Sequence, residues 1–138
     1  MKSLRIGMLF IGVLICIAAV LNAQARADDA MSRGKYFVDH VAMCIECHTP
    51  RNDKGEILSS KYLRGGPVPV KRPPYPNMKW AIIAPGIAGL VGYTDEQGVR
   101  LLTEGITADG REPNPPMPRF RFNREDAEAI VHYLKSLR

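Results

Sequence analysis

Two cysteines and a histidine within five residues constrain this 138-residue chain more than any other feature of its sequence. They form the segment Cys44-Ile45-Glu46-Cys47-His48, a C-x-x-C-H pattern that is the attachment motif for c-type haem. Two thiols three positions apart at the end of a helix can each reach one vinyl group of a single porphyrin. The histidine that follows presents its imidazole to the iron as the proximal ligand. The pattern therefore predicts one covalent haem held by Cys44, Cys47 and His48.

Other uses of a C-x-x-C pair are weaker but stay open on the residues alone. A thioredoxin-type redox pair should lie between a strand and a helix, whereas this pair follows an amphipathic helical pattern. A tetrahedral zinc site needs four ligands, and the only other histidines are His40 and His132, which fall off the apolar faces of their helices. A disulfide between Cys44 and Cys47 would close a very small loop of little entropic value. We expect haem attachment, with both other histidines at the surface.

The first 27 residues have the three parts of a secretory signal. Lys2 and Arg5 give a positive start, residues 6–21 are uncharged and apolar, and small residues follow at cleavage spacing. The apolar run is shorter than the about 20 residues that a spanning helix usually needs. An uncleaved membrane anchor is the alternative. We expect export to the periplasm, with residues 1–27 as the signal peptide.

Cleavage after Ala25 or Ala27 would leave one domain, residues 28–138. Cleavage after Ala27 would remove three of the 19 basic residues of the chain, leaving 16 against 14 acidic residues. This nearly balanced charge removes the main support for nucleic-acid binding. The membrane would be involved only through the export signal.

Helical periodicity predicts a first helix over about residues 30–43, with Asp29 as its N-cap. Its apolar face is made by Ala30, Gly34, Phe37, Val38 and Val41. Residues 64–89 contain six prolines, a density that leaves no room for a long helix or a central strand. We expect an ordered loop there, because its many apolar residues are untypical of a linker.

Two later helices have clear boundaries in the sequence. Residues 95–104 follow Thr94, which opens a capping box, and precede Gly105, which suits the C′ position. Residues 124–137 follow Asn123, a favourable N-cap. The apolar stripe of this last helix consists of Ala127, Ile130, Val131, Leu134 and Leu137.

A second axial ligand is expected downstream of the motif. Met117 lies in Asn114-Pro115-Pro116-Met117-Pro118, where prolines on both sides stiffen the backbone and lower the entropic cost of holding a weak thioether ligand. Met78 is the rival, whereas Met31 and Met43 are poorly placed to reach the opposite face of the haem. Any methionine can instead fill a gap in the core. We expect Met117 to ligate the iron together with the motif histidine.

Together these residues resemble the class I c-type cytochromes that carry a single haem. The resemblance covers residues 30–138, including the motif, Met117 and Tyr133-Leu134. In that family a glycine of the first helix packs under an aromatic residue of the last, which Gly34 and Tyr133 can supply. The resemblance implies an all-α, class I cytochrome c fold of about three main helices with long Pro- and Gly-rich loops around one haem.

The segment Cys47-His48-Thr49-Pro50-Arg51, together with Met117, is similar to cytochromes or cytochrome domains of bacterial periplasmic dehydrogenases. This implies an electron-transfer protein rather than an enzyme, because two protein ligands leave the iron no open position for a substrate. The implied partners are a dehydrogenase and a downstream cytochrome or oxidase of the respiratory chain. The alternative is a haem enzyme or gas sensor in which Met117 is displaced.

Two further groups of residues have open roles. Trp80 either donates its indole N–H to a haem propionate or fills the core. The candidate walls of the haem pocket are Trp80, Ile82, Ile83, Ile87, Leu90, Leu101 and Leu102. Basic residues in the Pro-rich middle and around Met117 are either solvated or form an encounter surface for an acidic partner. These basic residues are Lys61, Arg64, Lys71, Arg72, Lys79, Arg111, Arg119, Arg121 and Arg124.

Overall fold

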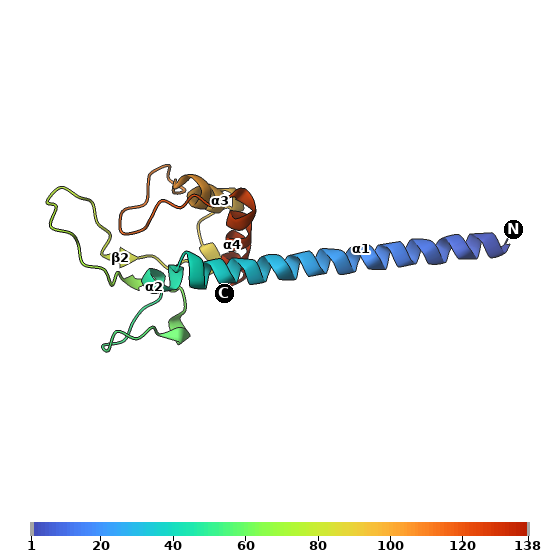
Figure 1. Ribbon diagram of the computed structural model, residues 1–138, viewed down its shortest axis with the longest axis horizontal. Helices are drawn as coiled ribbons and strands as arrows, with labels where there is room; N and C mark the ends of the chain where they lie inside the picture. Colours follow the sequence, from blue (N-terminus) through green and yellow to red (C-terminus); the bar gives the residue numbers. More distant parts are fainter. Residues whose placement is uncertain (1, 138) are drawn as a thin grey trace. The chain divides into compact units, whose positions relative to one another are not determined.

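A computed structural model describes residues 2–137 of the chain, with side chains described from residue 14 onward. The chain divides into two compact units, Met1–Ala30 and Met31–Arg138. Helix α1, Lys2–Tyr36, makes up the described part of the first unit, and its last residues belong to the second unit (Figure 1). Within the described part of the chain, none of the helices combines the length and the apolar character needed to cross a membrane.

The second unit is built from short helices and long loops, which confirms the all-α prediction. Its two strands pair antiparallel, with Gly66 opposite Ala84 and Pro67 opposite Ile83. After α1 the elements are the π-helix Phe37–Val41, α2 (Cys44–His48), a 3-10 helix at Ser59–Lys61, β1 (Gly66–Pro67), β2 (Ile83–Ala84), a 3-10 helix at Ala88–Leu90, α3 (Asp95–Glu104) and α4 (Arg124–Ser136).

The first helix differs from its prediction at both ends. Helix α1 runs unbroken through Asp29, which is therefore not an N-cap, because the alanine-rich stretch before it favours a continuing helix. At the other end the backbone widens into a π-helical turn, where the amide of Ala42 donates to the carbonyl of Phe37 at 2.7 Å. The wider turn shifts the helical register. Val41, predicted on the apolar face, is consequently 47% exposed.

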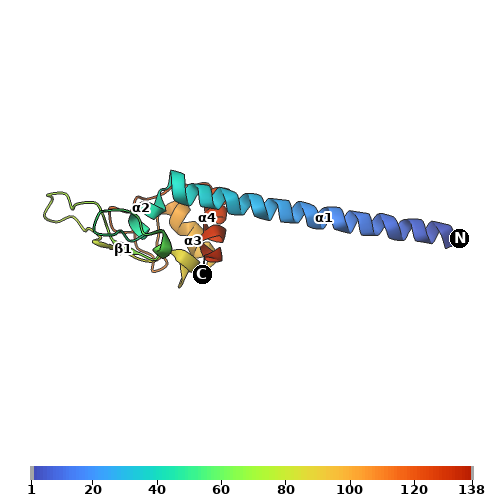
Figure 2. The ribbon, with the colours of Figure 1, turned by 90° about the horizontal axis from the view of Figure 1, so that it is seen from below.

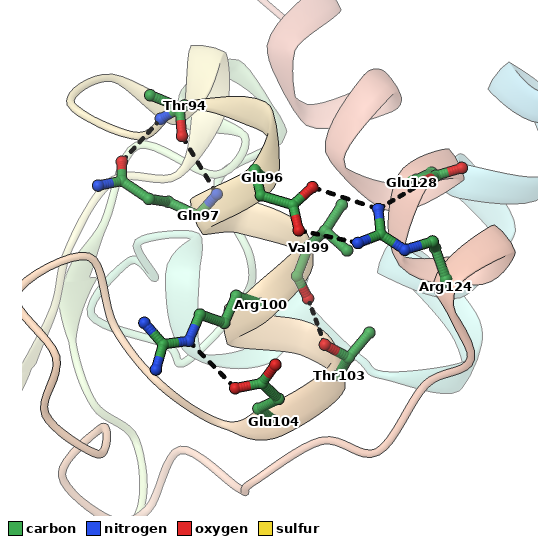
Figure 3. Close-up of polar contacts among 9 residues, drawn as sticks. All are labelled: Thr94, Glu96, Gln97, Val99, Arg100, Thr103, Glu104, Arg124 and Glu128. Carbon is green, nitrogen blue, oxygen red and sulfur yellow. Dashed lines mark hydrogen bonds and ion pairs between the residues drawn. The ribbon is translucent and has the colours of Figure 1, made fainter.

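Helices α3 and α4 have the predicted caps, and Figure 3 shows the cap of α3. The Thr94 hydroxyl accepts from the Gln97 amide at 3.2 Å, and the Gln97 side chain accepts from the Thr94 amide at 2.9 Å, which completes the capping box. Gly105 ends α3 with φ 73°, in the left-handed region that favours glycine. The Asn123 side chain accepts from the Asp126 amide at 2.8 Å. Local sequence signals alone thus define both helices.

The core of the second unit gathers α3, α4 and the turn after α1. A Cβ atom added at Gly34 would stand 2.8 Å from Tyr133 Cβ, which confirms the predicted approach of a glycine to an aromatic residue. Arg33 and Asp126 form an ion pair of 2.5 Å beside this contact. The buried cluster consists of Val38, Leu63, Leu90, Val99, Leu102, Ala127, Ile130, Val131, Tyr133 and Leu134.

Residues 66–84 form a long excursion, which we call the arm. The short β1–β2 pairing makes its stem, and Arg72 closes its tip by donating to the carbonyls of Pro76 at 3.0 Å and Met78 at 2.9 Å. Both views show this yellow-green segment extending away from the helices of the second unit (Figures 1 and 2). The arm lies in the region predicted to lack long helices and central strands, and that prediction is confirmed.

Candidate haem site

The C-x-x-C-H segment forms a helix of its own. Helix α2 covers Cys44–His48 and starts after Met43, whose backbone is left-handed at φ 51°. This turn separates the motif from the preceding π-helix. Thr49 is extended and ends the short helix. Residues three apart on a helix are neighbours on its surface, so α2 places the two thiols on the same side.

Both thiols are free and partly buried. Burial raises the pKa of the Cys44 thiol to about 11. The pKa of Cys47 is also raised, first by burial and then by the charge of Glu46, while Arg51 opposes the shift. A nucleophilic or redox-active cysteine has the opposite, lowered pKa. Among the described residues, no group of three or more His, Cys, Asp or Glu side chains could hold a metal ion.

His48 is buried and fixed in one orientation. Its side chain is 7% exposed, and its Nδ1 lies 2.7 Å from the carbonyl oxygen of Pro85. Because a carbonyl only accepts, Nδ1 carries the proton and Nε2 keeps a lone pair for a metal. Burial lowers the pKa of His48, and the bond to Pro85 partly opposes this shift. A neutral imidazole held by one nitrogen suits an axial iron ligand.

The backbone around His48 is held by the segment that leads into the arm. The Gly65 amide donates to the His48 carbonyl at 2.7 Å. The hydroxyl of buried Thr49 accepts from the Leu63 amide at 3.0 Å. Sequence reasoning gave no role to Pro85 and named Thr49 only as part of the segment that resembles dehydrogenase cytochromes. The Pro85 contact is made by a backbone oxygen, for which residue type gives no signal.

Arg51 supports the motif from the following turn. Its guanidinium pairs with Glu46, inside the motif, and donates to the Gly55 carbonyl at 2.7 Å. Its Nε is the one buried side-chain nitrogen or oxygen without a hydrogen-bond partner in the described part of the chain. A haem carries anionic propionates that accept such hydrogen bonds. The free thiols, the available His48 Nε2 and this unpartnered donor together fit a covalently attached haem.

Met117 lies partly buried in the loop between α3 and α4. Two residues earlier, the Pro115 carbonyl accepts from the Ala81 amide at 2.7 Å, which joins this loop to the arm. Met78 is 37% exposed at the tip of the arm, and Met43 is 52% exposed. The choice of Met117 as the distal ligand stays a prediction.

The remaining predicted site residues differ in how deeply they are buried. His40 and His132 are exposed, as predicted. Of the candidate pocket walls, Leu90 and Leu102 belong to the core cluster, whereas Ile82 is 73% and Ile83 59% exposed. The partly buried candidates are Trp80, Ile87 and Leu101.

Known proteins that are similar to this chain include c-type cytochromes and a cytochrome subunit. Residues 31–138 match the cytochrome c family. The chain is 32% identical over 115 residues to the fructose dehydrogenase cytochrome subunit of Gluconobacter japonicus, covering 80% of this chain and 22% of that protein. It is 33% identical over 108 residues to a diheme cytochrome c-type protein of Cereibacter sphaeroides, covering 75% and 34%.

A third relative is a nicotinate dehydrogenase subunit from Pseudomonas putida. The identity is 34% over 111 residues, covering 77% of this chain and 9% of the relative. The chain therefore spans about a third or less of the length of the curated relatives it matches.

Proposed function

Because the chain belongs to the cytochrome c family, we propose that it carries single electrons from a periplasmic dehydrogenase toward the respiratory chain through one haem ligated by His48 and Met117. Membership of the family makes the chain a c-type cytochrome with covalently bound haem, related to the cytochrome domains of dehydrogenases. The main support for the proposed haem ligation is the environment of His48. Its buried imidazole, held by Pro85 through Nδ1, follows directly on two free thiols.

Each residue of the proposed site has one task. Cys44 and Cys47 would form the two thioether bonds, and His48 would bind the iron through Nε2. The bound haem supplies an iron atom that accepts and releases one electron. Pro85 keeps the imidazole in one tautomer and orientation, and the prolines around Met117 limit the freedom of its loop. With His48 and Met117 both bound to the iron, no coordination position would be left for a substrate, which favours electron transfer over catalysis.

The location and the partners are inferred from the leader and the relatives. Residues 1–27 have the composition of an export signal. Two of the relatives are named as subunits of fructose dehydrogenase and nicotinate dehydrogenase. These names support a dehydrogenase as the electron donor in the periplasm. A downstream cytochrome or oxidase would then accept the electron.

Mass spectrometry tests the attachment site. Expression of the full chain with haem-maturation machinery should give a periplasmic protein that begins at residue 26 or 28. Its mass should include one haem that survives acid denaturation. Cys44→Ala and Cys47→Ala should each lose one thioether bond, while Cys16→Ala should leave the mature mass unchanged. A mature wild-type protein without haem would contradict the proposed attachment site.

Access of small ligands to the iron distinguishes an electron-transfer protein from a haem enzyme or gas sensor. The wild-type protein should titrate reversibly with one electron at an electrode. Its reduced form should resist carbon monoxide at concentrations that saturate an open haem. Rapid binding of carbon monoxide by the wild-type protein would instead support a haem enzyme or gas sensor.

A further inference from the structure

The middle of the chain carries positive charge without any acidic residue. Between Glu56 and Asp95 the sequence contains five basic residues and no Asp or Glu. All five are exposed. They are Lys61, Arg64, Lys71, Arg72 and Lys79.

Ion pairing separates these five residues from most of the other basic residues. Three arginines near Met117 pair with carboxylates: Arg111 with Asp109, Arg119 with Glu112, and Arg124 with both Glu96 and Glu128. These three arginines therefore add little to a positive surface. The encounter-surface interpretation of the sequence had included them. Among the side chains of residues 14–137, no carboxylate forms an ion pair with any of the five.

The arm combines three of these charges with exposed apolar side chains. Lys71, Arg72 and Lys79 lie in residues 66–84. Outside the candidate walls of the haem pocket, Val70 at 49% and Tyr75 at 62% are exposed apolar side chains of the arm. Protein interfaces commonly combine an apolar centre with a polar or charged rim. The arm is ordered by its stem and by Arg72, so a partner would meet a preformed surface.

The arm is anchored to the backbone near both proposed axial ligands. At one end the Gly65 amide donates to the His48 carbonyl, and at the other the Pro85 carbonyl accepts from His48 Nδ1. Ala81 donates to Pro115, two residues before Met117. The base of the arm therefore adjoins the haem site, and a protein docked along the arm would reach the site there.

We propose that the arm is the docking surface for an acidic redox protein, which exchanges electrons with the haem while bound there. This inference rests on the proposed function and names the partner by its chemistry. The uncompensated charges would attract an acidic face and raise the association rate, and the apolar side chains would hold the short-lived complex. An anionic membrane surface could attract the same charges, but it would not explain why the arm is anchored at the haem site.

Stopped-flow electron transfer to an acidic blue-copper protein tests the proposal. The probe would be mixed with the reduced, haem-loaded protein at ionic strengths from 0.01 to 0.1 M, where the Debye length falls from about 30 Å to about 10 Å. Lys71→Glu and Lys79→Glu each change the charge by two units, and neither side chain makes a hydrogen bond or ion pair among the described residues. With one probe carboxylate about 10 Å away in water, each reversal should slow the reaction about fourfold at low salt.

Lys54→Glu is the matched control, because Lys54 is exposed, lies outside the arm and gives the same change in net charge. It should change the rate less than about twofold, and the difference between variants should shrink as salt rises. All three variants should keep the wild-type haem spectrum. Equal effects of the three reversals, or rates independent of salt, would overturn the docking proposal.

Two further measurements separate the competing outcomes. Sedimentation with phosphatidylglycerol vesicles tests the membrane alternative. Vesicle binding that depends on Lys71 and Lys79, with unchanged rates toward the blue-copper protein, would assign the arm to a membrane instead. Electron exchange with a small neutral mediator tests the underlying function. If the wild-type protein fails even there, the proposed function fails, whereas normal exchange with no effect of the arm rejects the docking proposal alone.

Discussion

Gly34 lies directly against the backbone of Ala129, so that a Cβ atom at position 34 would stand 2.1 Å from the Ala129 carbonyl oxygen. The same atom would stand 2.8 Å from Tyr133 Cβ. Real Cβ contacts do not reach such distances. Only a glycine therefore lets the end of α1 approach α4 this closely, and the contact adjoins the buried side chains of the core.

Gly34→Ala should destabilise the protein despite the better helix propensity of alanine. Overpacking a close contact typically costs about 1–3 kcal/mol of stability. The higher helix propensity of alanine offsets up to about 1 kcal/mol of this cost. We expect a net loss of about 1 to 2 kcal/mol in the free energy of unfolding, measured by denaturant titration of the haem-loaded protein. Ser32→Ala, at an exposed position of the same helix, should change it by less than about 0.5 kcal/mol. Equal stability of both variants would contradict the close approach.

The parts of the fold that sequence reasoning predicted well depend on local signals. Thr94, Gly105 and Asn123 act within one helical turn, so their residue types are sufficient to define the ends of α3 and α4. The motif is equally local, because α2 contains both cysteines and the histidine. The Gly34–Tyr133 contact was predicted from family resemblance rather than from local pattern.

The parts that were missed depend on long-range packing or on backbone geometry. A sequence pattern with 3.6-residue periodicity does not predict a π-helical turn such as the one that exposes Val41. The bond between His48 and Pro85 joins positions 37 residues apart through a carbonyl that every residue possesses. Similarly, the pairing of Arg124 with Glu96 spans 28 residues and depends on the packing of α3 against α4 (Figure 3).

Asn123→Ala should shorten or fray the start of α4. The Asn123 side chain accepts from the Asp126 amide at 2.8 Å, and loss of an N-cap typically costs about 1 kcal/mol. We expect this decrease in the free energy of unfolding, together with faster amide exchange in the first turn of α4. Asn77→Ala, in the exposed tip of the arm, is the control and should leave both quantities near wild type. Unchanged exchange at Asp126 would show that the cap contributes nothing.

Tyr62 should make the protein less stable in alkali. Burial raises the pKa of Tyr62, and hydrogen bonds to Asp39 and Tyr133 raise it further. A pKa above the unfolded value of about 10 favours the folded state at lower pH, and this contribution is lost as the pH rises through the folded pKa. The free energy of unfolding should therefore begin to fall as the pH rises past about 10 and keep falling at higher pH, and it should fall less steeply in Tyr62→Phe.

Ser60→Ala serves as the control for the alkaline experiment, because it removes an exposed hydroxyl from the same short helical region. It should keep the wild-type slope of unfolding free energy against pH. Parallel curves for Tyr62→Phe and the wild-type protein would mean that the Tyr62 phenol does not contribute to the alkaline loss of stability.

Met117→Ala should open the distal side of the iron. Oxidised wild-type protein should show the weak near-infrared charge-transfer band of sulfur-bound ferric haem, and the variant should lose it. Sulfur ligation favours reduced iron, so loss of the thioether should also lower the reduction potential. The reduced variant should bind carbon monoxide, because one axial position is then free. Met78→Ala is the matched comparison, since Met78 also lies in a proline-rich loop and is 37% exposed. It should keep the band and the potential, and the reverse result would make Met78 the ligand.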